Sequence, residues 1–175
     1  QKAKKAKIAI TSVCLATIMA LTGYFIIKSK REILPGDSLI GSYVSMNKRV
    51  KDKDLDKDFV IIEFPNYEEE ITDKVYKNIE KCLEVKAPFG FHIKTNAKSI
   101  KEVNAEIARF DVEVTNYKFS YPVSIEFNNE DSYSDDELIT LINEFNKRLV
   151  ELNYLVEFSI SSERFDSIKD KLDSR

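Results

Sequence analysis

Short strand-like segments alternate with amphipathic helix patterns from residue 39 onward, and this alternation constrains the fold more than any other feature. In the clearest strand, Val123, Ile125 and Phe127 alternate with polar residues, so the apolar side chains share one face. Strands that are separated by helices form parallel β-α-β units with right-handed connections. We therefore predict a parallel α/β fold. The predicted strands are residues 39–45, 58–64, 88–93, a segment within 119–130, and 154–160; the predicted helices are residues 73–85, 97–111, 134–152 and 162–172.

Candidate functional residues stand at the end of the strand that contains Ile125. Ser134 and Glu137 have the spacing of a capping box, which predicts that a helix begins just after this strand. Glu126 and Asn128 are therefore expected at the carboxyl end of a strand that leads into a helix. In parallel α/β domains, ligands and reacting groups are found at this end. We predict that both residues belong to a functional site.

The same strand carries a family resemblance. Tyr121, Pro122 and Val123, with Glu126 and Asn128 beyond them, resemble the active-site strand of the glycoside hydrolase family 25 lysozymes (muramidases). In that family the strand reads roughly Tyr-Pro-Val-x-x-Asp-x-Glu. Glu126 takes the position of the family's Asp, and Asn128 takes the position of its Glu, which is the general acid.

Two further segments and one histidine extend the resemblance. Residues 41–45 resemble the family's Gly-Ile-Asp-Val-Ser strand, with Tyr43 in the place of the Asp, and residues 58–62 match its Asp-Phe-Val-Ile-Ile element. His92 is the single histidine and fills the slot of a family Tyr. The resemblance implies Tyr43, His92 and Asn128 as substrate-binding residues and Glu126 as the catalytic one. For His92 the alternative is a strand residue without a chemical role.

The resemblance also implies a parallel (β/α) barrel of the TIM type. It covers about residues 39–170 and corresponds to the front two-thirds of a family domain, so we expect an incomplete barrel. An open sheet edge needs a cover, which suggests a protein partner in the cell envelope. Peptidoglycan or another wall glycan is the implied ligand, and no cofactor is expected.

The residue at the acid position decides the predicted activity. Glycoside hydrolysis needs a carboxylic acid to protonate the leaving oxygen, and the amide of Asn128 cannot supply a proton at neutral pH. Losing a general acid typically lowers the rate by a factor of about 10²–10⁴. We expect a catalytically impaired peptidoglycan-binding or interaction platform. The alternatives are an active muramidase in which Glu126 or Glu130 is a displaced acid, and an unrelated α/β binding module.

An apolar segment precedes the predicted domain. Residues 8–27 are uncharged, and at about 1.5 Å per residue a helix of this length spans a bilayer core of roughly 30 Å. We predict a single-pass membrane anchor with the domain on the extracytoplasmic side; a cleaved signal peptide is the alternative. The predicted domains are a basic terminus with the anchor at 1–31, a linker at 32–38 and a lysozyme-like domain at 39–175.

Charge and cysteine content narrow the function classes further. The whole chain has a formal charge of −3 and residues 1–31 carry +7, so residues 32–175 carry −10. An acidic body argues against nucleic acid as a partner. Cys82 falls within a predicted helix, where a small core residue is a better interpretation than a nucleophile. No His or Cys cluster with the spacing of a metal site accompanies His92.

Overall fold

Residues 38–172 are described by the computed structural model, and they contain a five-stranded, fully parallel sheet. The spatial order of the strands equals their order along the chain, and each strand pairs with the next in parallel register. The predicted parallel α/β fold is therefore confirmed. The strands are β1 (Gly41–Val44), β2 (Phe59–Phe64), β3 (Phe89–Thr95), β4 (Val123–Phe127) and β5 (Val156–Ser159).

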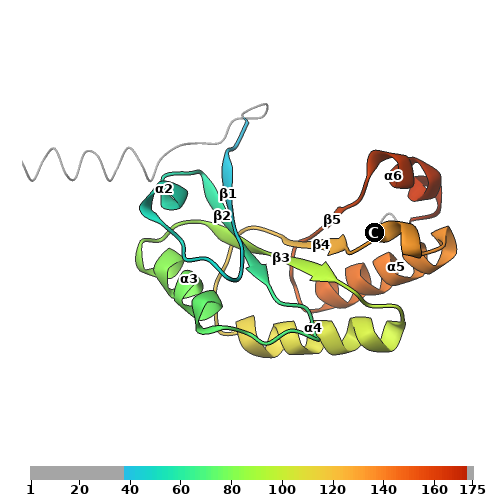
Figure 1. Cartoon of the computed structure of the whole chain (residues 1–175), viewed down its shortest axis with the longest axis horizontal. Helices are drawn as coiled ribbons and strands as arrows, with labels where there is room; N and C mark the ends of the chain where they lie inside the picture. Colours follow the sequence, from blue (N-terminus) through green and yellow to red (C-terminus); the bar gives the residue numbers. More distant parts are fainter. Residues whose placement is uncertain (1–37, 173–175) are drawn as a thin grey trace, which may run out of the picture. The chain divides into compact units, whose positions relative to one another are not determined.

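The long connecting helices cover one face of this sheet and leave the other face open (Figure 1). Right-handed crossovers between sequential neighbours place the long connecting helices on the same side, which is how strands are wound in a (β/α) barrel. The arrangement is that of part of such a barrel. The helices are α2 (Asp52–Leu55), α3 (Asp73–Glu84), α4 (Ile100–Val114), α5 (Asp135–Glu151) and α6 (Ser162–Ile168), with 3₁₀ turns at Glu130–Ser132 and Lys169–Lys171.

Aromatic side chains between the sheet and the helices form the centre of the core. Phe64 and Phe91, from neighbouring strands, both meet the ring of Phe110 on α4 edge to face, with centroids 5.1 and 5.3 Å apart. Burial of one such side chain contributes roughly 1.5–3 kcal/mol. Cys82 is fully buried on α3, and burial raises the pKa of its thiol to about 11. The prediction that Cys82 is a core residue is confirmed.

Two glycines let aromatic rings pack on the open face near the amino ends of the strands. The rings of Phe59 and Tyr121 stack with centroids 4.2 Å apart. A Cβ atom on Gly90 would lie 2.6 Å from the carbonyl oxygen of Pro122 and 2.8 Å from Cβ of Tyr121. A Cβ atom on Gly41 would overlap the ring of Phe59. Small residues are thus required on β1 and β3 for these rings to lie across the sheet.

Helix boundaries follow local capping more closely than the apolar pattern. The capping box of Ser134 and Glu137 is present at the start of α5. The helix predicted at 97–111 instead begins at Ile100, because the Ser99 hydroxyl accepts a hydrogen bond from the Glu102 N–H, and it continues to Val114. The charged segment 48–58 contains the short helix α2. The closing helix stops at Ile168 and continues as a 3₁₀ turn.

The predicted membrane anchor at residues 8–27 lies outside the described residues, as do the domain bounds before residue 38. Within 38–172, every helix is too short or too polar to cross a membrane. The anchor and the domain boundaries therefore stay predictions.

Candidate functional site

Polar side chains from neighbouring strands gather on the open face, toward the carboxyl ends of the strands. Side chains alternate between the two faces of a strand, so Glu63 on β2 points away from the helices while its neighbours Ile62 and Phe64 are buried against them. Parallel pairing sets Glu63 opposite His92 on β3, and Lys94 opposite Glu126 on β4. With Tyr43 on β1, these side chains form what we call the open-face cluster: Tyr43, Glu63, His92, Lys94 and Glu126.

His92 and Lys94 both approach the carboxylate of Glu126. His92 Nε2 lies 3.0 Å from Glu126 Oε2, and Lys94 Nζ lies 3.9 Å from Glu126 Oε1. His92 is buried, whereas the carboxylate remains partly open to solvent. The ring of Tyr43 stands edge-on to the imidazole, with centroids 5.5 Å apart. Three of the predicted site residues, Tyr43, His92 and Glu126, are therefore brought together.

Glu63 is a second carboxylate in the cluster and is held in its ionised form. Burial opposes the charge, but hydrogen bonds from the Ser45 hydroxyl, the Met46 N–H and the Tyr43 hydroxyl outweigh it and keep the pKa of Glu63 below its usual value. Burial, followed by the charge of Glu63 and the hydrogen bond to it, raises the pKa of Tyr43 well above its usual value. Tyr43 is thus a neutral hydroxyl with a half-exposed ring.

Asn128 lies on the rim of the site rather than within the cluster. Its N–H donates to the Thr95 carbonyl at 3.0 Å, and its Nδ2 donates to Asn96 Oδ1 at 3.1 Å. Asn96 Nδ2 in turn donates to Glu68 Oε2 at 3.3 Å. These bonds link the loops that follow β2, β3 and β4. The Asn128 side chain is consequently engaged with a neighbouring loop, and no hydrogen bond joins it to Glu126 within residues 38–172.

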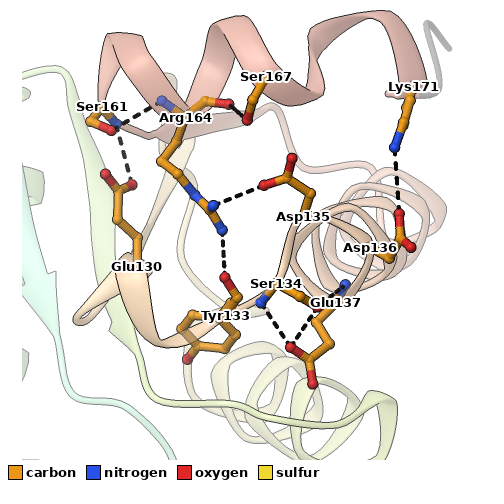
Figure 2. Close-up of polar contacts among 10 residues, drawn as sticks. All are labelled: Glu130, Tyr133, Ser134, Asp135, Asp136, Glu137, Ser161, Arg164, Ser167 and Lys171. Atoms are coloured by element: carbon orange, nitrogen blue, oxygen red, sulfur yellow. Dashed lines mark hydrogen bonds and ion pairs between the residues drawn. The ribbon is translucent and has the colours of Figure 1, made fainter.

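Glu130, which was considered as a displaced acid, is also engaged. Its Oε2 accepts the N–H of Ser161 at 3.2 Å, where α6 begins. Figure 2 shows the Glu130 carboxylate beside Ser161, from the loop that follows β4. The contact helps position α6 at the carboxyl end of the sheet.

Glu63 and Lys94 were missed in the sequence, although each carries a visible signal. Both are charged residues inside otherwise apolar strands, two positions from the strand's carboxyl end or closer. A strand buried on both faces would not tolerate them. A charge in such a run therefore marks the open face of the sheet.

The cluster has the chemistry of a hydrogen-bonding site for a polyhydroxy ligand. Glu63 and Glu126 accept hydrogen bonds, Lys94 donates them, and the ring of Tyr43 offers an apolar surface. An ionised Glu63 cannot protonate a leaving oxygen. Within residues 38–172, no three His, Cys, Asp or Glu side chains are grouped to hold a metal ion.

Comparison with known proteins places the fold. No protein-family model matches the sequence, and no curated protein matches it. Two solved structures of the modular autolysin LytC from Streptococcus pneumoniae are similar. The one in complex with a synthetic peptidoglycan ligand has a TM-score of 0.60 and 16% identity, over 75% of this chain and 34% of that chain. The other, at 1.6 Å resolution, has a TM-score of 0.63 and 14% identity, over 79% and 36%.

The chain thus spans about a third of the length of the autolysin structures that it matches. At these identities the similarity concerns the path of the backbone and not the side chains of the site. The parallel β/α arrangement of this chain is the fold found in part of the autolysin.

Proposed function

We propose that this chain is a membrane-anchored, extracytoplasmic domain related to the family 25 lysozymes, which binds peptidoglycan glycan through its open-face cluster and has lost most muramidase activity. The observation that carries the proposal is the position of the polar cluster. It lies at the carboxyl end of the parallel strands, on the open face of a fold that is shared with an autolysin.

The side chains of the cluster support binding over hydrolysis. Glu63 is kept ionised, and Glu126 faces the donors of His92 and Lys94. Asn128, at the family's acid position, is an amide bonded to Asn96. None of these groups is arranged as a carboxylic acid that could protonate a glycosidic oxygen.

The likeness to the autolysin supports the choice of ligand. The solved autolysin complex contains a synthetic peptidoglycan ligand. Sugars are commonly held by carboxylate and amide hydrogen bonds together with an aromatic ring, and Tyr43, Glu63 and Glu126 provide these groups here. The shared fold also argues against the alternative of an unrelated α/β binding module.

Sedimentation of the full chain with purified, insoluble peptidoglycan tests the proposal. We expect binding of the detergent-solubilised wild type, and a loss of at least fivefold in affinity for Tyr43→Ala and for Glu126→Gln. Glu80→Gln is the matched control, because it makes the same change on the exposed surface of α3, on the helix side of the sheet. Equal binding by all variants, or no binding by the folded wild type, would contradict the proposal.

Mass analysis of the soluble products separates the platform from the active muramidase. We expect no released muropeptides from the wild type. Release that is lost in Glu126→Gln and retained in Glu80→Gln would make Glu126 the displaced acid. Release that is lost instead on Glu130→Gln would assign that role to Glu130, despite its contact with Ser161.

A further inference from the structure

Exposed aliphatic side chains gather at one end of the domain, opposite the open-face cluster. In β/α units the helices run antiparallel to the strands, so the amino ends of strands lie beside the carboxyl ends of helices. Most of the large exposed aliphatic residues lie here, including Leu155 before β5 at 67% exposure and Val112 near the end of α4 at 71%. We call this end the amino-end surface, with aliphatic residues Ile40, Leu83, Val85, Val112, Val150 and Leu155.

Basic residues without ion pairs accompany these aliphatic side chains. Lys57, Lys86 and Lys118 are exposed in the loops before β2, β3 and β4, and they form no ion pair with other residues of 38–172. The nearby carboxylates of Glu84 and Glu151 are each paired with a basic residue three positions earlier. Lys57, Lys86 and Lys118 are therefore lysines without an ion-pair partner among residues 38–172, although the body as a whole is acidic.

Aspartates at the same end are each engaged in an interaction, among them Asp111 in the last turn of α4, whose Oδ1 accepts the Tyr154 hydroxyl at 2.7 Å. Asp58 Oδ2 accepts the N–H of Ile40 at 2.9 Å, and the Asp58 N–H donates to the Ile40 carbonyl at 2.9 Å. Asp56 also has an interaction partner. These aspartates are thus engaged in contacts, whereas Lys57, Lys86 and Lys118 form no ion pair among the described residues.

An apolar cleft opens between two of the lysines. It has a volume of about 280 Å³ and is bordered by Lys86 and Lys118, with Leu83, Phe89 and Phe119 among its lining residues. A cleft that is apolar inside and basic at its edge suits an amphipathic anion. Phospholipids with anionic headgroups have this chemistry.

The chain also enters the domain at this end. The two hydrogen bonds between Ile40 and Asp58 fix the residue that precedes β1 at the amino-end surface. The predicted anchor ends at residue 27, which leaves 12 residues before Ile40. An extended chain of 12 residues reaches at most about 40 Å. A bilayer spanned by residues 8–27 would lie within reach of the amino-end surface.

We propose that the amino-end surface lies on a membrane that contains anionic phospholipid, and that the open-face cluster is thereby turned away from the bilayer. The aliphatic side chains enter the headgroup region, while Lys57, Lys86 and Lys118 contact lipid phosphates. The proposal rests on the proposed anchor and localisation. It adds an orientation, which presents the glycan site to the wall rather than to the lipid.

Quenching of a site-specific fluorophore by spin-labelled lipid tests this orientation. The full chain is reconstituted into phosphatidylglycerol-containing vesicles in a Cys14→Ser background, where Cys82 is buried and protected. Bimane is attached at Val85→Cys or at Ile100→Cys. The two native residues have nearly equal exposure, 45% and 46%, but Ile100 begins α4 at the opposite end of the domain. We expect at least threefold stronger quenching at position 85.

Charge-neutralising variants test the role of the lysines. We expect Lys86→Gln with Lys118→Gln to reduce quenching at position 85 by at least half in anionic vesicles, and to leave it unchanged in phosphatidylcholine vesicles. Lys101→Gln, on α4 near its amino end, is the control and should change neither. No effect of the double variant in anionic vesicles would overturn the role of lipid phosphates.

The remaining outcomes separate this proposal from the proposed function. Equal quenching at positions 85 and 100 overturns the orientation, and peptidoglycan sedimentation in detergent then reports on the glycan site independently. Strong quenching at position 85 together with failed sedimentation retains the membrane surface and rejects the glycan site. Excimer emission between copies that carry pyrene at position 85, in place of lipid quenching, would assign the surface to a second copy and overturn the proposal.

Discussion

His92 Nε2 and Glu126 Oε2 lie 3.0 Å apart, and this contact joins the side chains of two adjacent strands on the open face of the sheet. The strand that resembles an active-site strand therefore carries a carboxylate that already has a protein partner. The imidazole is buried and the carboxylate is partly exposed, so the pair is anchored from the β3 side. A ligand would meet the free side of Glu126.

A double-mutant cycle measures this contact. We expect His92→Gln and Glu126→Gln to show a coupling of about 0.5–1 kcal/mol in the free energy of urea unfolding, because one partner is partly screened by water. Lys94→Gln should show weaker coupling to Glu126, since its ammonium is 3.9 Å away and exposed. A coupling to Lys94 that exceeds the coupling to His92 would reverse this order.

The sequence located the strand of Glu126 but not all of the cluster around it. Glu126 and His92 were visible because each is a polar residue in a strand with a family counterpart. Glu63 and Lys94 carry a signal of the open face, but they could not be assigned to this site, because pairing between β2, β3 and β4 depends on register, which a single strand does not encode. Asn128 was predicted at the same site, yet β4 ends at Phe127, and Asn128 in the following turn lies on the rim with Asn96.

The close packing around β3 predicts different costs for two glycine replacements. Gly90→Ala would press its methyl group against the backbone carbonyl of Pro122, which cannot rotate away, and we expect a loss of about 2–3 kcal/mol in the free energy of unfolding. In Gly41→Ala, on the edge strand β1, the atoms nearest to the new methyl group belong to the Phe59 ring, which is a side chain and can shift, so this variant should cost less. Urea titrations of both variants check the order. Equal losses would show that the ring of Phe59 is as immobile as the backbone.

We expect Arg164 to be the main residue that holds α6 against the start of α5. Its Nη1 donates to Asp135 Oδ1 at 2.8 Å and its Nη2 to the Tyr133 carbonyl at 2.6 Å, across the start of α5 (Figure 2). Arg164→Gln should cost about 1–3 kcal/mol, because charge-assisted hydrogen bonds in a partly buried setting are lost. Faster amide hydrogen exchange in α6 would show that the helix is held less firmly in this variant.

Lys171 provides the matched comparison for Arg164. Its Nζ lies 3.5 Å from Asp136 Oδ1, and both side chains are exposed. Lys171→Gln should therefore change stability by only a few tenths of a kcal/mol, since exposed ion pairs contribute little. If the two variants accelerated exchange in α6 equally, general charge attraction rather than the Arg164 hydrogen bonds would hold the helix.

Sequence patterns predicted the order of the strands and long helices because short strand-like apolar runs alternate with helical apolar patterns along the chain. The bounds of the elements differ from the predicted bounds where an N-cap residue, and not the apolar pattern, sets the start of a helix. Ala97 belongs to the apolar core, but Ser99 starts α4 two residues later, since its hydroxyl satisfies the Glu102 N–H. The buried carboxyl of Glu106 on the same helix was likewise not foreseen. A carboxylic acid on an amphipathic helix is usually exposed to solvent. Only the packing of Glu106 against the end of β3 shows that this one is buried.

Glu106 is a buried acid between α4 and the carboxyl end of β3. Its Oε2 accepts a hydrogen bond from the Thr95 hydroxyl at 2.5 Å, and the Tyr67 N–H also donates to this carboxyl. Among residues 38–172, Oε1 has no hydrogen-bond partner. Burial outweighs these donors and the charge of Arg109, and it raises the pKa of Glu106 to about 7.

The raised pKa predicts that stability falls as the pH rises. The folded protein holds the proton of Glu106 more tightly than the unfolded chain, so the contribution is complete below the unfolded pKa of 4.5 and is lost as the pH passes through about 7. The unfolded and folded pKa values differ by an amount equivalent to about 3 kcal/mol.

Glu106→Gln imitates the protonated acid and should remove this pH dependence. The variant should therefore be more stable than the wild type at pH 8 and similarly stable at pH 5. Urea unfolding at both pH values measures the difference, with Glu80→Gln on exposed α3 as the control. A wild type that gains stability between pH 5 and pH 8 relative to Glu106→Gln would show that the buried carboxyl is ionised in the folded state.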